Sequence, residues 1–229
     1  LLGNMHIASG SILDVGVTNY NITIEGNWVH DIGGTFNELN GTVTFSGGNN
    51  QIIDGNLSET FYNLTINKSA WNVQPIDNST PIIVSNDFTI TAGTFETAGN
   101  ILTVSGNSTI GGTLSTNNVA GIANLNNIAF AGGTIGSATN LGSVNIGGTL
   151  SVSSGNGTIG RVNLDVSGST TIDATRTLSF TNINGSKVFE GLVTNNGSWN
   201  NTANEDIELR NGLTHSGTSF NSGTGKYNF

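Results

Sequence analysis

The chain of 229 residues contains no cysteine and only two prolines. Without cysteine it has no disulfide bond, no thiol nucleophile and no cysteine-ligated zinc. Proline removes the backbone N–H that a β-ladder needs, so its scarcity suits a chain whose strands lie almost entirely within ladders. The sequence also lacks an apolar run of about 18 residues, and residues 1–4 have neither the basic region nor the apolar run of a signal peptide. We therefore predict no membrane-spanning segment.

Charge is scarce as well: 9% of the residues are charged, with 15 acidic and 6 basic side chains and a formal net charge of −9. The acidic residues are scattered and form no dense run, which is typical of a solvated surface. Lys68 is the only basic residue before Arg161. We expect no nucleic-acid partner, because a phosphate-binding surface needs a stripe of lysine and arginine.

Glycine, asparagine, serine and threonine are abundant, and β-branched residues recur in short runs that alternate with small polar ones. Disordered segments are also rich in glycine, but they lack β-branched residues, so this chain is expected to be ordered and β. Runs with a period of two, typical of strands, occupy residues 22–24, 42–45, 64–66, 88–90, 102–104, 128–130, 144–146, 162–164, 178–180 and 207–209.

The pattern small-Gly-Thr-apolar recurs along the chain, with its threonines at Thr35, Thr94, Thr113, Thr134 and Thr149. The spacings are 59, 19, 21 and 15 residues, which fit a turn of about 20 residues, with the last gap an irregular turn. We predict an all-β, right-handed parallel β-helix, or β-solenoid, of about 20 residues per turn. An antiparallel sandwich pair or a mixed array is the alternative, but Asn-Gly hairpin turns are too few to close every strand pair.

The two ends of the chain resemble each other, since residues 22–45 parallel residues 207–229. Neither end has a charged or proline-rich cap, which a terminal solenoid turn needs. Residues 1–229 are therefore expected to be a single solenoid segment of a longer repeat protein, with neighbouring repeats of the same chain as its partners.

Part of the chain carries a family resemblance. Its carriers are residues 26–28 (Gly-Asn-Trp), 34–37 (Gly-Thr-Phe-Asn), 41–47 (Gly-Thr-Val-Thr-Phe-Ser-Gly), 51–53 (Gln-Ile-Ile) and 60–67 (Thr-Phe-Tyr-Asn-Leu-Thr-Ile-Asn). This block resembles the repeat regions of large secreted surface proteins of Bacteroidota, both adhesin-like and gliding-associated, that the type IX system exports. The middle of the chain looks like a filamentous-haemagglutinin-type β-helix. The resemblance implies an extracellular stalk at the cell surface, with a role in adhesion or surface motility and no catalytic residues.

Catalytic and metal chemistry have little support in the sequence. Asp165 and Asp173 lie near Arg161 and Arg176 and form the only local acid–base group, which we expect to consist of surface ion pairs. The three histidines, His6, His30 and His215, lack metal-type spacing. The glycine-rich nonapeptide of calcium-binding β-helices is absent, so structural calcium is not indicated. We predict neither an enzyme nor a cofactor.

Aromatic side chains are the remaining candidates for a site, because their faces can stack on sugars. We select Trp71, Trp28 and Tyr62, with Trp71 the best exposed candidate because it follows the turn at residues 68–70. Trp28 and Trp199 share a turn context, which also favours packing at repeat edges. Three hypotheses follow: a stiff structural or adhesive spacer, then a carbohydrate-binding module for surface polysaccharide, and, a distant third, a polysaccharide lyase or hydrolase. An ice-binding face is weighed lower, because it needs a regular array and the threonine rows look irregular in sequence.

Overall fold

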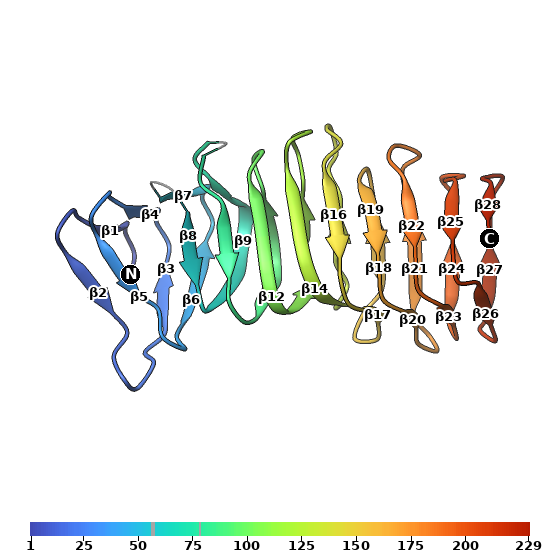
Figure 1. The fold of residues 1–229 in the computed structure, drawn as a ribbon, viewed down its shortest axis with the longest axis horizontal. Coiled ribbons are helices and arrows are strands. Elements are labelled where there is room, and N and C mark those ends of the chain that lie inside the picture. Colours follow the sequence, from blue (N-terminus) through green and yellow to red (C-terminus); the bar gives the residue numbers. More distant parts are fainter. Residues whose placement is uncertain (56–57, 78) are drawn as a thin grey trace.

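The computed structural model describes residues 1–55, 58–77 and 79–229 and shows a parallel β-solenoid (Figure 1). The described residues form about 11 turns of about 21 residues each and contain no helix. Successive turns lie side by side along the long axis, from the blue N-terminal end to the red C-terminal end. With a strand spacing of 4.7–4.9 Å, the stack is about 50 Å long.

Each turn has three sides, which we call face 1, face 2 and face 3 in chain order. Face 1 contains β3 (Ile22–Ile24), β6 (Thr42–Gly47), the start of β9 (Asn63–Pro75) and of β11 (Phe88–Glu96), the end of β12 (Ile101–Ile110) and of β14 (Ile122–Phe130), β17 (Leu150–Val152), β20 (Thr170–Ile172), β23 (Val193–Asn195) and β26 (Leu213–His215). The long strands therefore bend around a corner of the solenoid.

Face 2 contains β1 (Met5–Ile7), β4 (Trp28–His30), β7 (Gln51–Gly55), the ends of β9 and β11, β13 (Thr113–Ser115), β15 (Thr134–Ile135), β18 (Gly157–Ile159), β21 (Thr177–Phe180), β24 (Ser198–Asn200) and β27 (Ser219–Asn221). Face 3 contains β2 (Ile12–Asp14), β5 (Thr35–Asn37), β8 (Glu59–Phe61), β10 (Ile82–Val84), the starts of β12 and β14, β16 (Ser143–Ile146), β19 (Asn163–Val166), β22 (Lys187–Phe189), β25 (Ile207–Leu209) and β28 (Tyr227–Asn228). All these strand pairs are parallel.

The length of the turn varies along the rod. Along face 1, the residues that pair from turn to turn are Ile22, Val43, Leu64, Phe88, Ser108, Ile128, Leu150, Thr170, Val193 and Leu213. Counted in residues along the chain, the interval from Leu64 to Phe88 is the longest in this column, and the interval from Phe88 to Ser108 is among the shortest. The predicted parallel solenoid is confirmed, with a mean turn of about 21 residues.

The Gly-Thr pattern, however, does not mark one position of the turn. Thr94, Thr113 and Thr134 stack on face 2, but the next residue in their column is Thr158. Thr149 instead precedes β17 on face 1, and Thr35 begins β5 on face 3. The irregular turn predicted between Thr134 and Thr149 is therefore wrong.

The physical reason is that all three corners need small residues. At Gly112, for example, an added Cβ would clash with the carbonyl oxygen of Gly93 in the turn before. The Cβ of a residue at Gly168, on the corner between faces 3 and 1, would clash in the same way with Gly148. The Gly-Thr motif can therefore occur at any of the three corners, so the spacing between two copies need not equal the length of a turn.

Inward side chains stack into one continuous core. The inward column of face 3 is Phe61, Val84, Val104, Leu125, Ile146, Val166, Phe189 and Leu209, all at most 3% exposed. Burial of each such side chain stabilises the fold by roughly 1.5–3 kcal/mol. The alternating runs thus place their apolar residues inward, as the sequence predicted.

Polar side chains connect the turns at the corner that leads into face 1. The backbone N–H of Thr42 donates to Asn21 Oδ1 at 2.9 Å, and that of Asn107 donates to Asp87 Oδ1 at 3.0 Å. Further along, Asn127 Oδ1 accepts the backbone N–H of Thr149 at 2.9 Å. These oxygens satisfy backbone donors that no strand partner reaches, so the abundant asparagine is structural.

The outward side of face 1 carries a regular column. Its described members are Thr23, Thr44, Thr65, Thr89, Thr109, Ala129, Ser151, Thr171, Thr194 and Thr214. The expectation that the threonine rows are irregular is wrong here. Ala129 and Ser151 interrupt the column, however, and the residues two positions away are of mixed type, for example Asn63 and Asn67 beside Thr65, so it is not the two-dimensional threonine array that ice binding needs.

Candidate functional site

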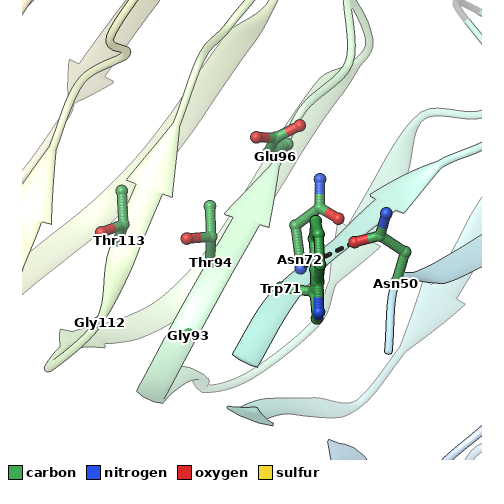
Figure 2. A pocket seen from close by; sticks show the side chains of 8 residues that line it. All are labelled: Asn50, Trp71, Asn72, Gly93, Thr94, Glu96, Gly112 and Thr113. Atoms are coloured by element: carbon green, nitrogen blue, oxygen red, sulfur yellow. Dashed lines mark hydrogen bonds between the residues drawn. The ribbon is translucent and has the colours of Figure 1, made fainter. Parts of the chain in front are cut away.

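A lateral groove of about 630 Å³ lies on the corner between faces 1 and 2. We call it the Trp71 groove; its lining residues, labelled in Figure 2, are Asn50, Trp71, Asn72, Gly93, Thr94, Glu96, Gly112 and Thr113. They come from neighbouring turns, through β9, β11 and β13. The volume falls within the range of about 300–1,000 Å³ that is usual for small-molecule sites.

A bulge in β9 presents Trp71 to solvent. Ala92 of β11 pairs with Asn67 and Thr94 pairs with Asn72, so residues 68–71 of β9 lie opposite Gly93 alone. Trp71 has a φ of 65° and its side chain is 67% exposed. A left-handed backbone costs a non-glycine residue about 1–2 kcal/mol. Bulges of this kind often re-aim a side chain next to a binding site.

Lys68 fixes the base of the bulge from inside. Its side chain turns into the rod, where Nζ donates to Ser46 O at 3.0 Å, to Asn49 O at 2.6 Å and to Gln51 Oε1. Gln51 Nε2 in turn donates to Gly26 O at 2.5 Å, one turn nearer the N-terminus. Burial lowers the pKa of Lys68, although the charge of Glu25 partly opposes this effect. The lysine therefore holds the bulge in place and presents no charge to the groove.

Polar groups line the floor and sides of the groove. The backbone N–H of Asn72 donates to Asn50 Oδ1 at 3.4 Å, and Asn117 Nδ2 donates to Glu96 Oε2 at 2.8 Å. Within the described part of the chain, the hydroxyl groups of Thr94 and Thr113 make no hydrogen bond. Glu96 is the only titratable group among the described residues that line the groove.

The three aromatic residues predicted to contact sugar do not lie together. Trp71 lines the groove, whereas Trp28 is fully buried and packs against Phe36 with ring centroids 4.8 Å apart. Tyr62 is half-buried and precedes β9, at the opposite end of the face 1 segment from Trp71. We correct the prediction for Trp28, because a fully buried ring offers no face to a ligand.

The expected acid–base group is also dispersed. Asp165 points outward on face 3, and Asp173 follows β20 on face 1. Arg161 Nη1 donates to Thr139 O at 3.1 Å and Arg176 Nε donates to Ser153 O at 2.9 Å. None of the ion pairs in residues 1–55, 58–77 and 79–229 joins these acids to these arginines, so the expected surface ion pairs do not form.

The histidines lie in separate turns. His6 Nε2 lies 3.0 Å from Asp31 Oδ2, and His30 Nδ1 lies 2.9 Å from Glu59 Oε2. His215 Nδ1 lies 3.1 Å from Asn195 Nδ2. In the part of the chain that the structure describes, no three His, Asp or Glu residues are grouped so as to hold a metal ion.

Besides Lys68 and Glu59, a buried ion pair was missed in the sequence. Lys187 Nζ lies 2.7 Å from Glu205 Oε1, and their side chains are 0% and 1% exposed. Burial lowers the pKa of Lys187 and raises that of Glu205, although each charge partly offsets the effect on the other. The pair lies inside the rod, so its role is structural.

Comparison with known proteins gave no relative: no family model, curated protein or solved structure matches the chain. Among the described residues there is no helix of the length and apolar character that would cross a membrane. The function is therefore argued from the rod and the Trp71 groove alone.

Proposed function

We propose that the chain is a stalk segment of a large cell-surface or secreted filamentous protein, where it acts as a stiff extracellular spacer in adhesion or surface motility. The observation that carries the proposal is the parallel stack, in which the strands of faces 1 and 2 pair with those of the next turn along the whole rod around one core. Each turn contacts its neighbours only, so a rod of this kind gains length with every repeat.

The corners support the same proposal. Side-chain oxygens of asparagine and aspartate hold backbone donors of the next turn, for example Asn156 with Thr177 and Asp206 with Lys226. Such bonds resist shear between turns because a relative shift breaks them together with the ladder. Two of the six basic residues, Lys68 and Lys187, are buried, which leaves few sites for trypsin-like proteases at an exposed location.

The test is surface labelling of the organism that makes the protein. Antibodies against the folded segment should label intact cells at a distance from the envelope, and external protease should remove the parent protein's distal part. Labelling that appears only after the cells are lysed would contradict an extracellular stalk.

A second candidate function is carbohydrate binding, which the Trp71 groove favours. An exposed indole beside hydroxyl and amide side chains combines the apolar face and the hydrogen-bonding groups that a sugar needs. Trp71→Ala should abolish binding to a glycan array while leaving the circular dichroism spectrum unchanged. Equal binding by the variant would exclude the groove as the site.

A further inference from the structure

The orientation of the Trp71 ring limits how a sugar can lie in the groove. Figure 2 shows the indole edge-on, standing between Asn50 and Thr94, so one ring face looks toward Thr94 and Thr113. Thr94 is the register partner of both Asn72 and Thr113. A ligand ring stacked on this face would therefore lie over the two threonines, with its edge toward Glu96.

A pyranose matches this arrangement. Its axial C–H bonds form an apolar face that carries partial positive charge, and the face of an indole is negative. The hydroxyl groups at its edge would meet Thr94, Thr113 and Glu96, whose side chains keep free hydrogen-bonding capacity. The groove is open at the surface, so an internal residue of a longer glycan fits as well as a terminal one.

Glu96 gives the groove its charge. Its Oε2 accepts Asn117 Nδ2, which orients the carboxylate, and Oε1 has no partner among the described residues. Lys68, the basic residue at the base of the bulge, is buried and donates to Ser46, Asn49 and Gln51 instead. The carboxylate of Glu96 therefore faces the groove without a compensating cation from the residues that line it.

We infer that the Trp71 groove binds uncharged glycans, and that Glu96 selects them by accepting a sugar hydroxyl and repelling acidic sugars. This inference rests on the second candidate function, carbohydrate binding at Trp71. A carboxylate is a strong acceptor for a hydroxyl group but repels the carboxylate of a uronic acid at the same position. The unfavourable contact thus contributes to specificity as much as the favourable one.

The experiment compares matched oligosaccharides that differ only at C6: β-1,4-linked mannose with β-1,4-linked mannuronate, and carboxyl-reduced oligogalacturonate with oligogalacturonate itself. Calorimetry gives the affinities. Acrylamide quenching of tryptophan fluorescence locates the ligand, because Trp28 and Trp199 are fully buried and only Trp71 is exposed. The variants are Trp71→Ala, Glu96→Gln and, as a control with the same charge change on face 3, Asp165→Asn.

We expect the neutral member of a pair to bind, to protect Trp71 from acrylamide, and to lose binding in Trp71→Ala. The acidic member should bind about tenfold more weakly, as repulsion at close range in a partly hydrated site implies. Glu96→Gln should remove most of this difference, and Asp165→Asn should preserve it.

Two outcomes would overturn the inference in distinguishable ways. If neutral and acidic members bind equally and both require Trp71, the selectivity of Glu96 is refuted while carbohydrate binding stands. If no oligosaccharide of either pair binds, or if binding survives Trp71→Ala, carbohydrate binding at this groove is refuted together with the inference.

Discussion

Replacing Lys187 by methionine should lower the free energy of unfolding by about 3–5 kcal/mol at pH 7, because the Glu205 carboxylate then stays buried without its cation. The loss is expected to be electrostatic rather than a packing defect. Lys187 occupies an inward position of face 3, paired with Leu164 and adjacent in the next turn to Ile207. Methionine matches its length and suits those apolar neighbours.

The size of this loss in stability depends on how the charge of the Glu205 carboxylate is compensated. Oε2 of Glu205 has no hydrogen-bond partner in the described residues, so Lys187 is the main group that compensates the charge. Replacing both residues by methionine removes the buried charge altogether, and a well-packed apolar pair is often as stable as the ion pair. We expect the double variant to lie within about 1 kcal/mol of the original chain.

Urea unfolding followed by tryptophan fluorescence measures both variants, because the buried ring of Trp199 lies 5.7 Å from that of Phe189, in the same strand as Lys187. The deficit of Lys187→Met should shrink as the pH falls, since burial already raises the pKa of Glu205 and a protonated carboxyl group needs no cation. Equal losses in the single and double variants would refute the reasoning, because they would indicate lost packing.

Three further predictions concern the bulge, the pH dependence and the core. Trp71→Gly should be more stable than Trp71→Ala by about 0.5–1.5 kcal/mol in urea unfolding, because glycine adopts a positive φ without strain; equal stabilities would show that the backbone is relaxed. Burial raises the pKa of Glu59 and Glu205 above 4.5, so the folded chain holds these protons more tightly than the unfolded chain. Its free energy of unfolding should therefore fall as the pH rises from 4.5 through their folded pKa values, and Glu205→Gln should flatten the curve; an unchanged curve would contradict this origin. Phe130→Ala, at a fully buried position, should cost about 3–5 kcal/mol by thermal or urea unfolding, whereas Ala129→Thr on the outward side should cost nothing measurable; similar losses for the two would place the core on the wrong side of the strand.

The parallel solenoid could be predicted because the sequence contains two of its features: the alternation of apolar and polar residues, and the short repeat. The sequence does not predict the register, because glycine followed by threonine occurs at all three corners, as at Gly34, Gly112 and Gly148. The unequal lengths of successive turns then hide the threonine column of face 1. Only the backbone pairing shows which residues lie above one another.

The buried charged residues were not predicted, although the alternation of apolar and polar residues indicates where they lie. Lys68 lies an even number of residues after Leu64 and Ile66, so its side chain points inward like theirs. For the same reason Lys187 points inward with Phe189, and Glu59 with Phe61. A charged residue at a position where the alternation predicts an apolar one is buried when neighbouring groups can form hydrogen bonds or an ion pair with it. Chain order alone does not give those neighbours, since they come from carbonyl groups and side chains of other turns.

Trp71 could be selected from its turn context, but its groove could not. Thr94 and Thr113 reach it from the next two turns, and Asn50 reaches it from the turn before. Trp28 has an equally suitable local sequence and is nevertheless fully buried, because it lies in the inward phase of β4. Whether a side chain is exposed thus depends on whether its position in the strand points inward or outward, and not on the residue type.

The stiff rod is tested most directly by a distance measured along it. The chain contains no cysteine, so Thr23→Cys and Thr214→Cys, at the two ends of the outward column of face 1, can carry spin labels at those two positions alone. Nine stacking steps of 4.7–4.9 Å give a separation of about 43 Å between the labelled backbones. The account predicts a single narrow distance distribution near that value in pulsed electron paramagnetic resonance. A broad distribution, or a mean far from it, would contradict a rigid parallel stack and with it the proposed spacer.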